Sequence, residues 1–313
     1  MVGAAHPQDY RLDRVAPSSI IDRWWFHKNH VQYLPTERLP RMANAKELQE
    51  IDLALAAQVA EEAACRAGAL IQKAFKLPRQ IERKGIIDLV TDTDKASEAL
   101  IANILHNAFP TCNIVGEEGA RYRSTSTATP FVWWIDPLDG TYNFVRGIPR
   151  FCVSMGCTDP AGNALVGVVY DPMFDECFRA VRGGGATCNG APIGVSSTSQ
   201  LQEALAASGS PPEPQTANDH TTVWSVFMSR CRAMAWMGSA ALDLCYIASG
   251  RFDVYWEYGL APWDVCAGVL IVREAGGLVT DYQGQSFDIS RGGQLLASNS
   301  RLHSEALGIL NPA

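Results

Sequence analysis

Several features that define common protein classes are missing from this chain of 313 residues. Its 26 Lys and Arg residues form no basic run, so we do not expect nucleic acid as the main partner. No apolar segment approaches the ~20 residues needed to cross a bilayer. Residues 1–7 have neither the basic start nor the apolar core of a secretory signal. We therefore expect a soluble, cytoplasmic protein with no membrane partner.

The nine cysteines are odd in number and form no Cys-x-x-Cys pair. Most of them lie among apolar residues, so buried free thiols in a reducing compartment are expected. The same spacing disfavours a zinc site. His27 and His30 could share one face of a helix as metal ligands. No nearby Cys or acidic pair completes such a site, and we interpret them as surface histidines.

The composition is that of a globular protein, with 47% hydrophobic and 19% charged residues. The length allows one large domain or two fused layers around a well-buried core. Residues 1–44 mix charges, prolines and aromatics without a clear period, and we interpret them as an N-terminal extension. We expect an N-terminal α+β half over 45–192 and a C-terminal α/β half over 193–313, which meet at a linker-like stretch.

The most informative stretch covers residues 133–147. An apolar run over 131–135 predicts a buried strand, and it is followed at once by Asp136, Pro137, Leu138 and Asp139. Two carboxylates three residues apart repel each other unless positive charge lies between them. The net charge of −7 means that a site for anionic phosphate needs a local cation. We therefore predict a divalent metal site here, with a phosphate opposite.

Other acids stand where helices begin or strands end. Asp94 precedes a second amphipathic helical pattern, and Asp264 begins a long helix after Pro262. Both could simply cap these helices. Glu117 follows a short strand over 113–116 and could be an ordinary surface acid. We keep all three as site candidates because the two acids of the central stretch need partners.

The remaining pattern predicts a helix over 48–75, a hairpin over 81–90 and a strand meander over 151–181. A strand over 205–208, a polar loop over 211–221 and a helix over 238–249 come next. A strand leads toward Glu257, and further short strands and a helical tail follow the helix over 262–275. The three glycines at 183–185 predict a hairpin turn and not a phosphate loop, because no Gly-Lys-Ser or Gly-Lys-Thr follows.

Taken together, the motifs resemble the inositol monophosphatase family. They are Asp88–Asp94, Gly116–Glu118, Trp134–Thr141 with Asn143 and Phe144, and Trp263 and Asp264 with Ala267, Gly268 and Glu274–Gly277. The resemblance covers about residues 46–310. It implies an α/β layered fold, an αβαβα sandwich with mostly antiparallel sheet in the first half and a smaller α/β second half.

The resemblance also implies the site residues. One Mg²⁺ would be held by Glu117, Asp136 and the Leu138 carbonyl, and a second by Asp136, Asp139 and Asp264. A third, weaker ion would use Glu117 and water. Glu117, Thr141 and Asp94 would position and activate the attacking water, while the N–H groups of Gly140 and Thr141 would hold phosphate oxygens. Carboxylates suit Mg²⁺, and no His/Cys cluster suggests zinc or iron.

The expected activity is hydrolysis of a phosphate monoester, inositol 1-phosphate above all. Glu257 would accept hydrogen bonds from the polyol, beside a loop of Gly238, Ser239 and Ala240, although it could also be a surface Glu. Histidinol phosphate, fructose 1,6-bisphosphate and 3′-nucleotides are rival substrates, and a non-catalytic binding role with residues 1–44 as a docking arm is a second class. Lys84 resembles a family lysine that screens the metals. The resemblance further implies a homodimer and inhibition by lithium.

Overall fold

The computed structural model describes residues 51–77, 81–83, 89–124, 131–209 and 217–311. All of them belong to one compact unit. The predicted extension 1–44, with His27 and His30, lies outside the described residues, as do Lys84 and Asp88. None of the helices in the described part is long and apolar enough to cross a membrane.

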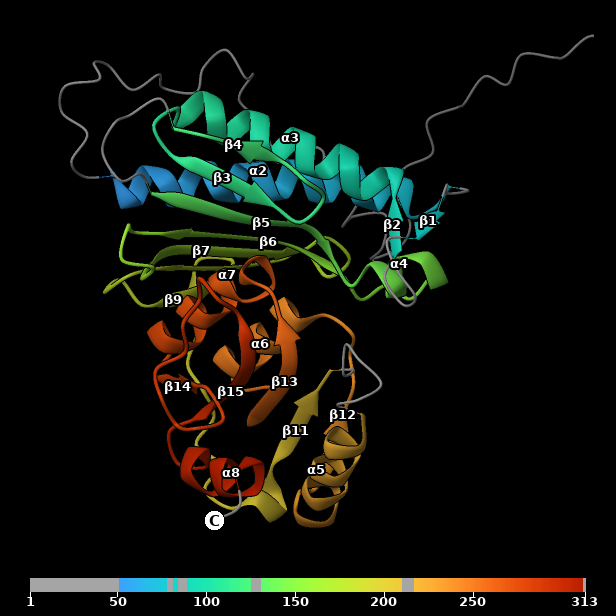
Figure 1. Ribbon diagram of the computed structural model, residues 1–313, viewed down its shortest axis with the longest axis vertical. Coiled ribbons are helices and arrows are strands. Elements are labelled where there is room, and N and C mark those ends of the chain that lie inside the picture. Colours follow the sequence, from blue (N-terminus) through green and yellow to red (C-terminus); the bar gives the residue numbers. More distant parts are fainter. Residues whose placement is uncertain (1–50, 78–80, 84–88, 125–130, 210–216, 312–313) are drawn as a thin grey trace, which may run out of the picture. The chain divides into compact units, whose positions relative to one another are not determined.

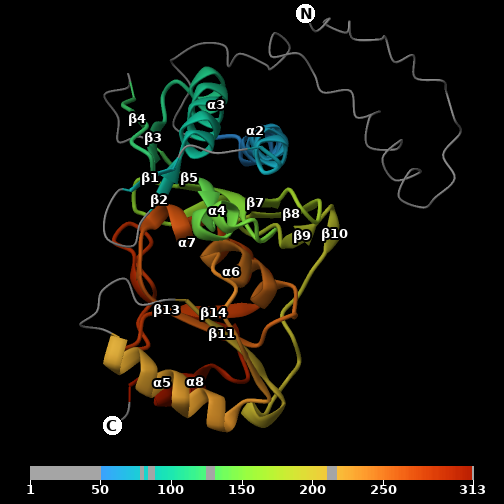
Figure 2. The same ribbon diagram turned by 90° about the vertical axis from the view of Figure 1, so that its right-hand side faces the viewer.

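Helices and sheets alternate in five layers (Figure 1). The helices are α2 (Leu53–Ala74), α3 (Asp92–Ala108), α4 (Thr141–Arg146), α5 (Ala217–Arg230), α6 (Ala240–Ala248), α7 (Pro262–Glu274) and α8 (His303–Leu310). Helices α2 and α3 cover one face of a large sheet, and α6 and α7 fill the space between it and a smaller sheet (Figure 2). Helices α5 and α8 pack on the outer side of the smaller sheet. This arrangement confirms the predicted αβαβα sandwich.

Two sheets carry these layers. The large sheet has the strand order β10-β9-β8-β7-β6-β5-β3-β4, and the small one β12-β11-β13-β15-β14. Their strands are β3 (Asn113–Gly116), β4 (Arg121–Tyr122), β5 (Val132–Asp139), β6 (Cys152–Thr158), β7 (Ala164–Asp171), β8 (Glu176–Val181), β9 (Ala186–Cys188), β10 (Ala191–Pro192), β11 (Leu205–Ser208), β12 (Ala233–Ala235), β13 (Val254–Leu260), β14 (Gly277–Thr280) and β15 (Gly293–Asn299). In the large sheet only β3 and β5 pair in parallel. A separate hairpin joins β1 (Ile81–Arg83) to β2 (Leu89–Thr91).

One predicted element is wrong. The polar loop expected over 211–221 gives way to helix α5 from Ala217 onward, and strand β12 was not predicted either. The first turns of α5 are polar and carry no apolar spacing. The helix is held instead by a distant contact, because the ring of Phe227 stacks on Trp256 of β13 with ring centroids 3.9 Å apart. Tertiary packing therefore decides this helix, which a local pattern does not reveal.

Helix α7 packs unusually close to the large sheet because glycines face it. A side chain at Gly156 of β6 would collide with Cys266, and a Cβ at Gly167 of β7 would lie 2.7 Å from the Ala267 carbonyl oxygen. Residues 265–272 of α7 are all buried. This close packing brings the first turn of α7, with Asp264, to β5.

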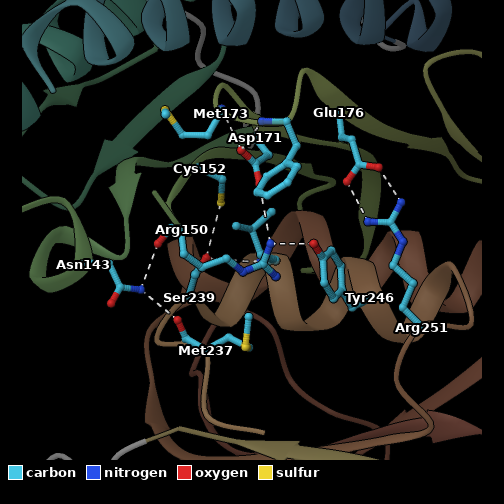
Figure 3. Close-up of polar contacts among 12 residues, drawn as sticks. Asn143, Arg150, Cys152, Asp171, Met173, Glu176, Met237, Ser239, Tyr246 and Arg251 are labelled. Carbon is cyan, nitrogen blue, oxygen red and sulfur yellow. Dashed lines mark hydrogen bonds and ion pairs between the residues drawn. The ribbon is translucent and has the colours of Figure 1, made fainter. Parts of the chain in front are cut away.

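A buried cation joins the large sheet to α6 (Figure 3). Arg150 is 6% exposed. Its Nη1 donates to the Tyr246 hydroxyl at 2.7 Å and lies 3.6 Å from Asp171 Oδ2. Burial raises the pKa of the Asp171 and Asp243 carboxyl groups, and the positive charge of Arg150 opposes both shifts. The guanidinium therefore compensates two carboxylates that the fold removes from water.

Replacement of this cation tests its contribution to stability. We expect Arg150→Met to lower the free energy of unfolding by about 3 kcal/mol at pH 7, because it leaves two buried carboxylates without compensation. The loss should shrink as the pH falls, since the carboxyl groups then bind protons and become neutral. Urea denaturation followed by circular dichroism measures both effects.

The matched control is Arg251→Met. Arg251 also contacts Tyr246, but its side chain is 39% exposed and pairs with Glu176 at the surface. We expect this variant to lose less than about 1 kcal/mol. Equal losses in the two variants would contradict the role given to Arg150.

Candidate active site

Asp136 and Asp139 point to the same side of β5 because a β-bulge separates them. Asp136 stands opposite Ser154 of β6 and Asp139 opposite Cys152. Pro137 and Leu138, which lie between the two acids, therefore both face Val153 of β6. In a regular strand, residues three apart point to opposite faces. The extra residue of the bulge restores a common face for the two carboxylates. The Asp-Pro-Leu-Asp sequence therefore forms a bulge that places its two acids on the same face of the sheet.

Glu117 reaches the same place from the neighbouring strand. Strand β3 runs parallel to β5 with Gly116 beside Ile135. The Glu117 N–H donates to the Ile135 carbonyl oxygen at 3.1 Å, which continues the pairing by one residue. Residues at matched positions of parallel strands share a face, so Glu117 lies next to Asp136. Its position at a strand end is thus a structural requirement of the cluster.

Asp264 is supplied by the first turn of α7. Its Oδ2 accepts a hydrogen bond from the Ala261 N–H at 2.7 Å, in a capping arrangement. Asp264 was expected to be able to cap the helix from its start; the N-cap position is instead occupied by Ala261, and Asp264 contributes to the cap from the third position of the helix. Only one carboxylate oxygen is used in this way, and no described residue donates to the other. Capping and membership of the acid cluster are therefore compatible.

Neighbouring acids raise the pKa of Asp136 and of Asp264. The pKa of Asp136 lies well above its usual range because the residue is 2% exposed, and because Glu117, Asp139 and Asp264 add negative charge. Burial and the charges of Asp139 and Glu117 do the same to Asp264. The acids are thus close enough to repel strongly. A cation placed among them would remove this repulsion.

The donor set suits a hard cation. Asp136 Oδ1 accepts from the Leu138 N–H at 3.0 Å, and its other oxygen takes no hydrogen bond from the described residues. Among the described residues, no group of three or more His, Cys, Asp or Glu side chains is arranged to hold a metal ion by itself. Mg²⁺ does not depend on such a group, because it binds through one or two carboxylates and keeps several waters. The open, oxygen-only cluster fits this ion.

Asp139 is anchored to the start of α6. Its Oδ2 accepts hydrogen bonds from Ser239 Oγ at 2.6 Å and from the Ala241 N–H at 2.8 Å. Cys152 Sγ lies 3.7 Å from the same oxygen and also 3.7 Å from Ser239 Oγ, the contact drawn in Figure 3. Ser239 also caps α6. Ser239 was expected beside the substrate, and these contacts give it a further task, the orientation of Asp139.

The buried Asp94 and the half-buried Thr141 form a pair next to the bulge. Thr141 Oγ1 lies 3.0 Å from Asp94 Oδ1 and 2.9 Å from the Leu138 carbonyl oxygen. The other oxygen of Asp94 accepts from the Thr91 N–H at 2.9 Å in a capping box. Burial raises the pKa of Asp94, although the hydrogen bonds from Thr91 and Thr141 oppose the shift. Asp94 is again both a cap and a member of the site.

The turn after β5 is built around a glycine. Gly140 has a φ of 93°, and a Cβ there would lie 2.9 Å from the Arg150 carbonyl oxygen and 3.2 Å from that of Gly238. The Asn143 amide donates to the Arg150 carbonyl at 2.9 Å and to the Met237 carbonyl at 2.8 Å (Figure 3). These contacts hold the Gly140–Thr141 turn against the predicted substrate loop at Gly238.

Glu257 lies in β13, close enough to the acid cluster for the charge of Asp139 to affect its pKa. The residue is half-buried, its carboxylate accepts from the Tyr255 hydroxyl, and a side chain at Gly209 would occupy its place. Burial raises the pKa of Glu257 to about 8, and the charges of Asp243 and Asp139 contribute. A freely solvated surface glutamate would show none of these features.

Sequence reasoning missed one important residue. Glu98 Oε2 accepts from the Glu118 N–H and Oε1 from the Ala120 N–H, both at 2.7 Å. Glu98 thereby fixes the turn that follows Glu117. Its position four residues after Asp94 places both acids on one face of α3, and this spacing was the available signal.

Comparisons with known proteins identify the family of this chain. A model of the inositol monophosphatase family matches residues 52–312. The chain is 44% identical over 259 residues to inositol monophosphatase 2 of Solanum lycopersicum, covering 81% of this chain and 97% of the relative. It is 39% identical over 245 residues to Nus factor SuhB of Pseudomonas aeruginosa, covering 75% and 90%.

A solved structure shows the same architecture. The crystal structure of an IMPase/NADP phosphatase complexed with Mg²⁺ and phosphate superposes with a TM-score of 0.69 at 25% identity. The match covers 79% of this chain and 92% of that one. The sequence motifs, the layered fold and these matches lead to one conclusion. The chain belongs to the inositol monophosphatase family, whose members are phosphatases.

Proposed function

We propose that this protein hydrolyses a phosphate monoester, inositol 1-phosphate, with the help of Mg²⁺. The observation that carries the proposal is the cluster of Glu117, Asp136, Asp139 and Asp264, in which the charges of the neighbouring acids raise the pKa of Asp136 and Asp264. Such a cluster disfavours the empty, ionised state and favours cation binding. The related structure that contains Mg²⁺ and phosphate supports the same chemistry.

The expected ligand sets divide the cluster between two main ions. Glu117, Asp136 and the Leu138 carbonyl would hold one, and Asp136, Asp139 and Asp264 the other, with a third, weaker ion at Glu117. When bound, such ions supply positive charge that activates a water on one side of phosphorus and neutralises the leaving oxygen on the other. The bulge at Asp136 and the Ser239 contact to Asp139 fix the ligand oxygens in advance.

Asp94 and Thr141 are placed to handle a proton. The Thr141 hydroxyl has one hydrogen but lies within hydrogen-bonding distance of both Asp94 Oδ1 and the Leu138 carbonyl. If the Leu138 carbonyl is engaged elsewhere, the hydrogen goes to Asp94 and the Thr141 oxygen can accept one from water. The raised pKa of Asp94 makes it a better proton acceptor than an ordinary aspartate. We assign Glu117, Thr141 and Asp94 to the orientation and activation of the water.

The Gly140–Thr141 turn is the proposed phosphate site. Gly140 precedes α4 in the left-handed conformation, and the first N–H groups of a helix have no intrahelical partner and can bind an anion. The same turn touches the loop at Gly238. A phosphate held here would have its ester group beside Gly238, Ser239 and Ala240.

We assign Glu257 to recognition of the alcohol part of the phosphate ester. Above its pKa of about 8, the ionised carboxylate of Glu257 can accept hydrogen bonds from two neighbouring hydroxyls, which a polyol such as inositol provides. Histidinol phosphate, fructose 1,6-bisphosphate and 3′-nucleotides remain the rival substrates. A non-catalytic regulatory role is the second candidate, which the name of the related Nus factor favours. A cytoplasmic location, a homodimer and lithium inhibition remain proposals that follow from the family resemblance.

Asp139→Asn tests the metal site. We expect kcat/KM for inositol 1-phosphate to fall by about 10²–10³-fold in saturating Mg²⁺, because a ligand charge is lost while the Ser239 contact can persist. In the presence of a chelator, the unfolding temperature of the variant should equal or exceed that of the wild type, because the substitution removes the buried negative charge of Asp139. Phosphate release and thermal unfolding provide the two measurements.

Asp288→Asn is the control for charge alone, since this side chain is 51% exposed and lies outside the cluster. Its activity should equal that of the wild type. Retention of full activity by Asp139→Asn would refute the ligand assignment. Absence of phosphate release from the wild-type protein with every substrate would favour the regulatory role.

Glu257→Gln tests the substrate. We expect KM for inositol 1-phosphate to rise about tenfold, which corresponds to about 1.4 kcal/mol, because the carboxylate no longer accepts from two hydroxyls. KM for p-nitrophenyl phosphate, which has no such hydroxyls, should not change. A wild-type panel that includes histidinol, fructose and nucleotide phosphates completes the test. Much faster turnover of histidinol phosphate would overturn the inositol assignment.

A further inference from the structure

One pair of cysteines comes together from distant parts of the chain. All nine cysteines are free thiols, and six are buried. Cys65 lies on α2 and Cys177 on β8, and each thiol shifts the pKa of the other, as two neighbouring side chains do. Neither residue belongs to the acid cluster, and α2 covers the face of the large sheet that is turned away from α7 (Figure 2).

Two neighbouring contacts fix this alignment independently. Arg179 Nη1 of β8 donates to Glu61 Oε2 of α2 at 3.0 Å. From that ion pair, Cys65 is four residues further along the helix, a rise of about 6 Å. Cys177 is two residues back along the strand, about 6.6 Å away and on the same face. Measured from the Glu61–Arg179 ion pair, Cys65 and Cys177 therefore lie at nearly the same distance and toward the same end of the sheet.

A second contact extends the same register. Gly68 of α2 packs directly on the Tyr170 ring of β7. Tyr170 is the strand partner of Cys177. The helix therefore runs antiparallel to β8, with Cys65 between the two fixed points. Packing on both sides holds the thiols together.

The two thiols differ in reactivity. Cys65 is half-buried and therefore the more accessible of the two, and its pKa is lowered by the neighbouring Cys177 thiol, although burial and Glu61 oppose this. Cys177 is buried, and its pKa is raised by the neighbouring Cys65 thiol and by burial. The thiolate is the reactive form, so an oxidant should attack Cys65 first. Cys177 is then the adjacent resolving thiol.

We propose that Cys65 and Cys177 form a peroxide-sensitive thiol pair that closes a disulfide between α2 and β8. In the first step the Cys65 thiolate attacks an oxygen of hydrogen peroxide, the O–O bond breaks, and the departing hydroxide takes a proton and leaves as water. The product is a sulfenic acid. In the second step the Cys177 sulfur attacks the Cys65 sulfur, the S–O bond breaks, and the Cys177 proton leaves with the hydroxide as a second water. Two thiols and one peroxide thus give one disulfide and two waters.

Peptide mapping by mass spectrometry tests the pair in the reduced, full-length protein treated with an equimolar amount of hydrogen peroxide. We expect a Cys65–Cys177 cross-linked peptide, with a mass lower by two hydrogen atoms than the two peptides together. The cross-link should form at least about tenfold faster than oxidation of Cys231, which is half-buried but has a pKa raised to about 11. This measurement needs no variant and is independent of the proposed phosphatase function.

Two variants and a control identify the roles. Cys177→Ser should stop the reaction at the Cys65 sulfenic acid, which dimedone traps, and Cys65→Ser should abolish both products. Cys231→Ser should cross-link like the wild type. The proposal fails if Cys65 reacts no faster than Cys231. It also fails if sulfenic acid persists in the wild type, or if either thiol cross-links to another cysteine.

Discussion

Repulsion among four carboxylates is the constraint around which the rest of the structure is arranged. Glu117, Asp136, Asp139 and Asp264 come from two strands and a helix, and the negative charge of their neighbours raises the pKa of Asp136 and Asp264. Three features impose their proximity: the parallel pairing of β3 and β5, the bulge in β5, and the close packing of α7 on Gly156 and Gly167 of the large sheet. This repulsion is relieved either by protons on the carboxyl groups or by a bound cation that replaces them. The site is best understood as the reason for these three features.

The surrounding structure gives this cluster its rigidity. Each acid uses a carboxylate oxygen or a neighbouring backbone group for a fixed hydrogen bond, and Ser239 and Glu98 serve mainly this purpose. The network extends through Asn143 to Arg150, whose charge compensates buried acids between the layers. Preorganised ligand oxygens lose little freedom on binding, which favours binding at a defined geometry. Stability and function therefore share the same residues at this end of the large sheet.

Much of the site could be predicted from the sequence because its acids stand at recognisable boundaries. Glu117 ends a strand, Asp94 and Asp264 begin helices, and Asp136 ends an apolar run. The fold class followed from the family motifs. What stayed hidden depends on distant contacts: the bulge that aligns Asp136 with Asp139 needs the register with β6, and α5 needs Trp256. The Cys65–Cys177 pair likewise depends on how α2 lies across β8. Boundary signals are local in the chain, whereas register and packing are not.

The most direct test of the account is the proton balance of Mg²⁺ binding. The metal-free protein should bind Mg²⁺ and release protons at pH 7, because carboxyl groups with a raised pKa must ionise to become ligands. Titration of the protein with MgCl₂ in a weakly buffered solution, followed with a pH indicator and by calorimetry in two buffers, measures the number released. Proton release that disappears in Asp136→Asn is the predicted result. Binding without proton release, or no binding at all, would contradict the claim that mutual repulsion of these carboxylates defines the site.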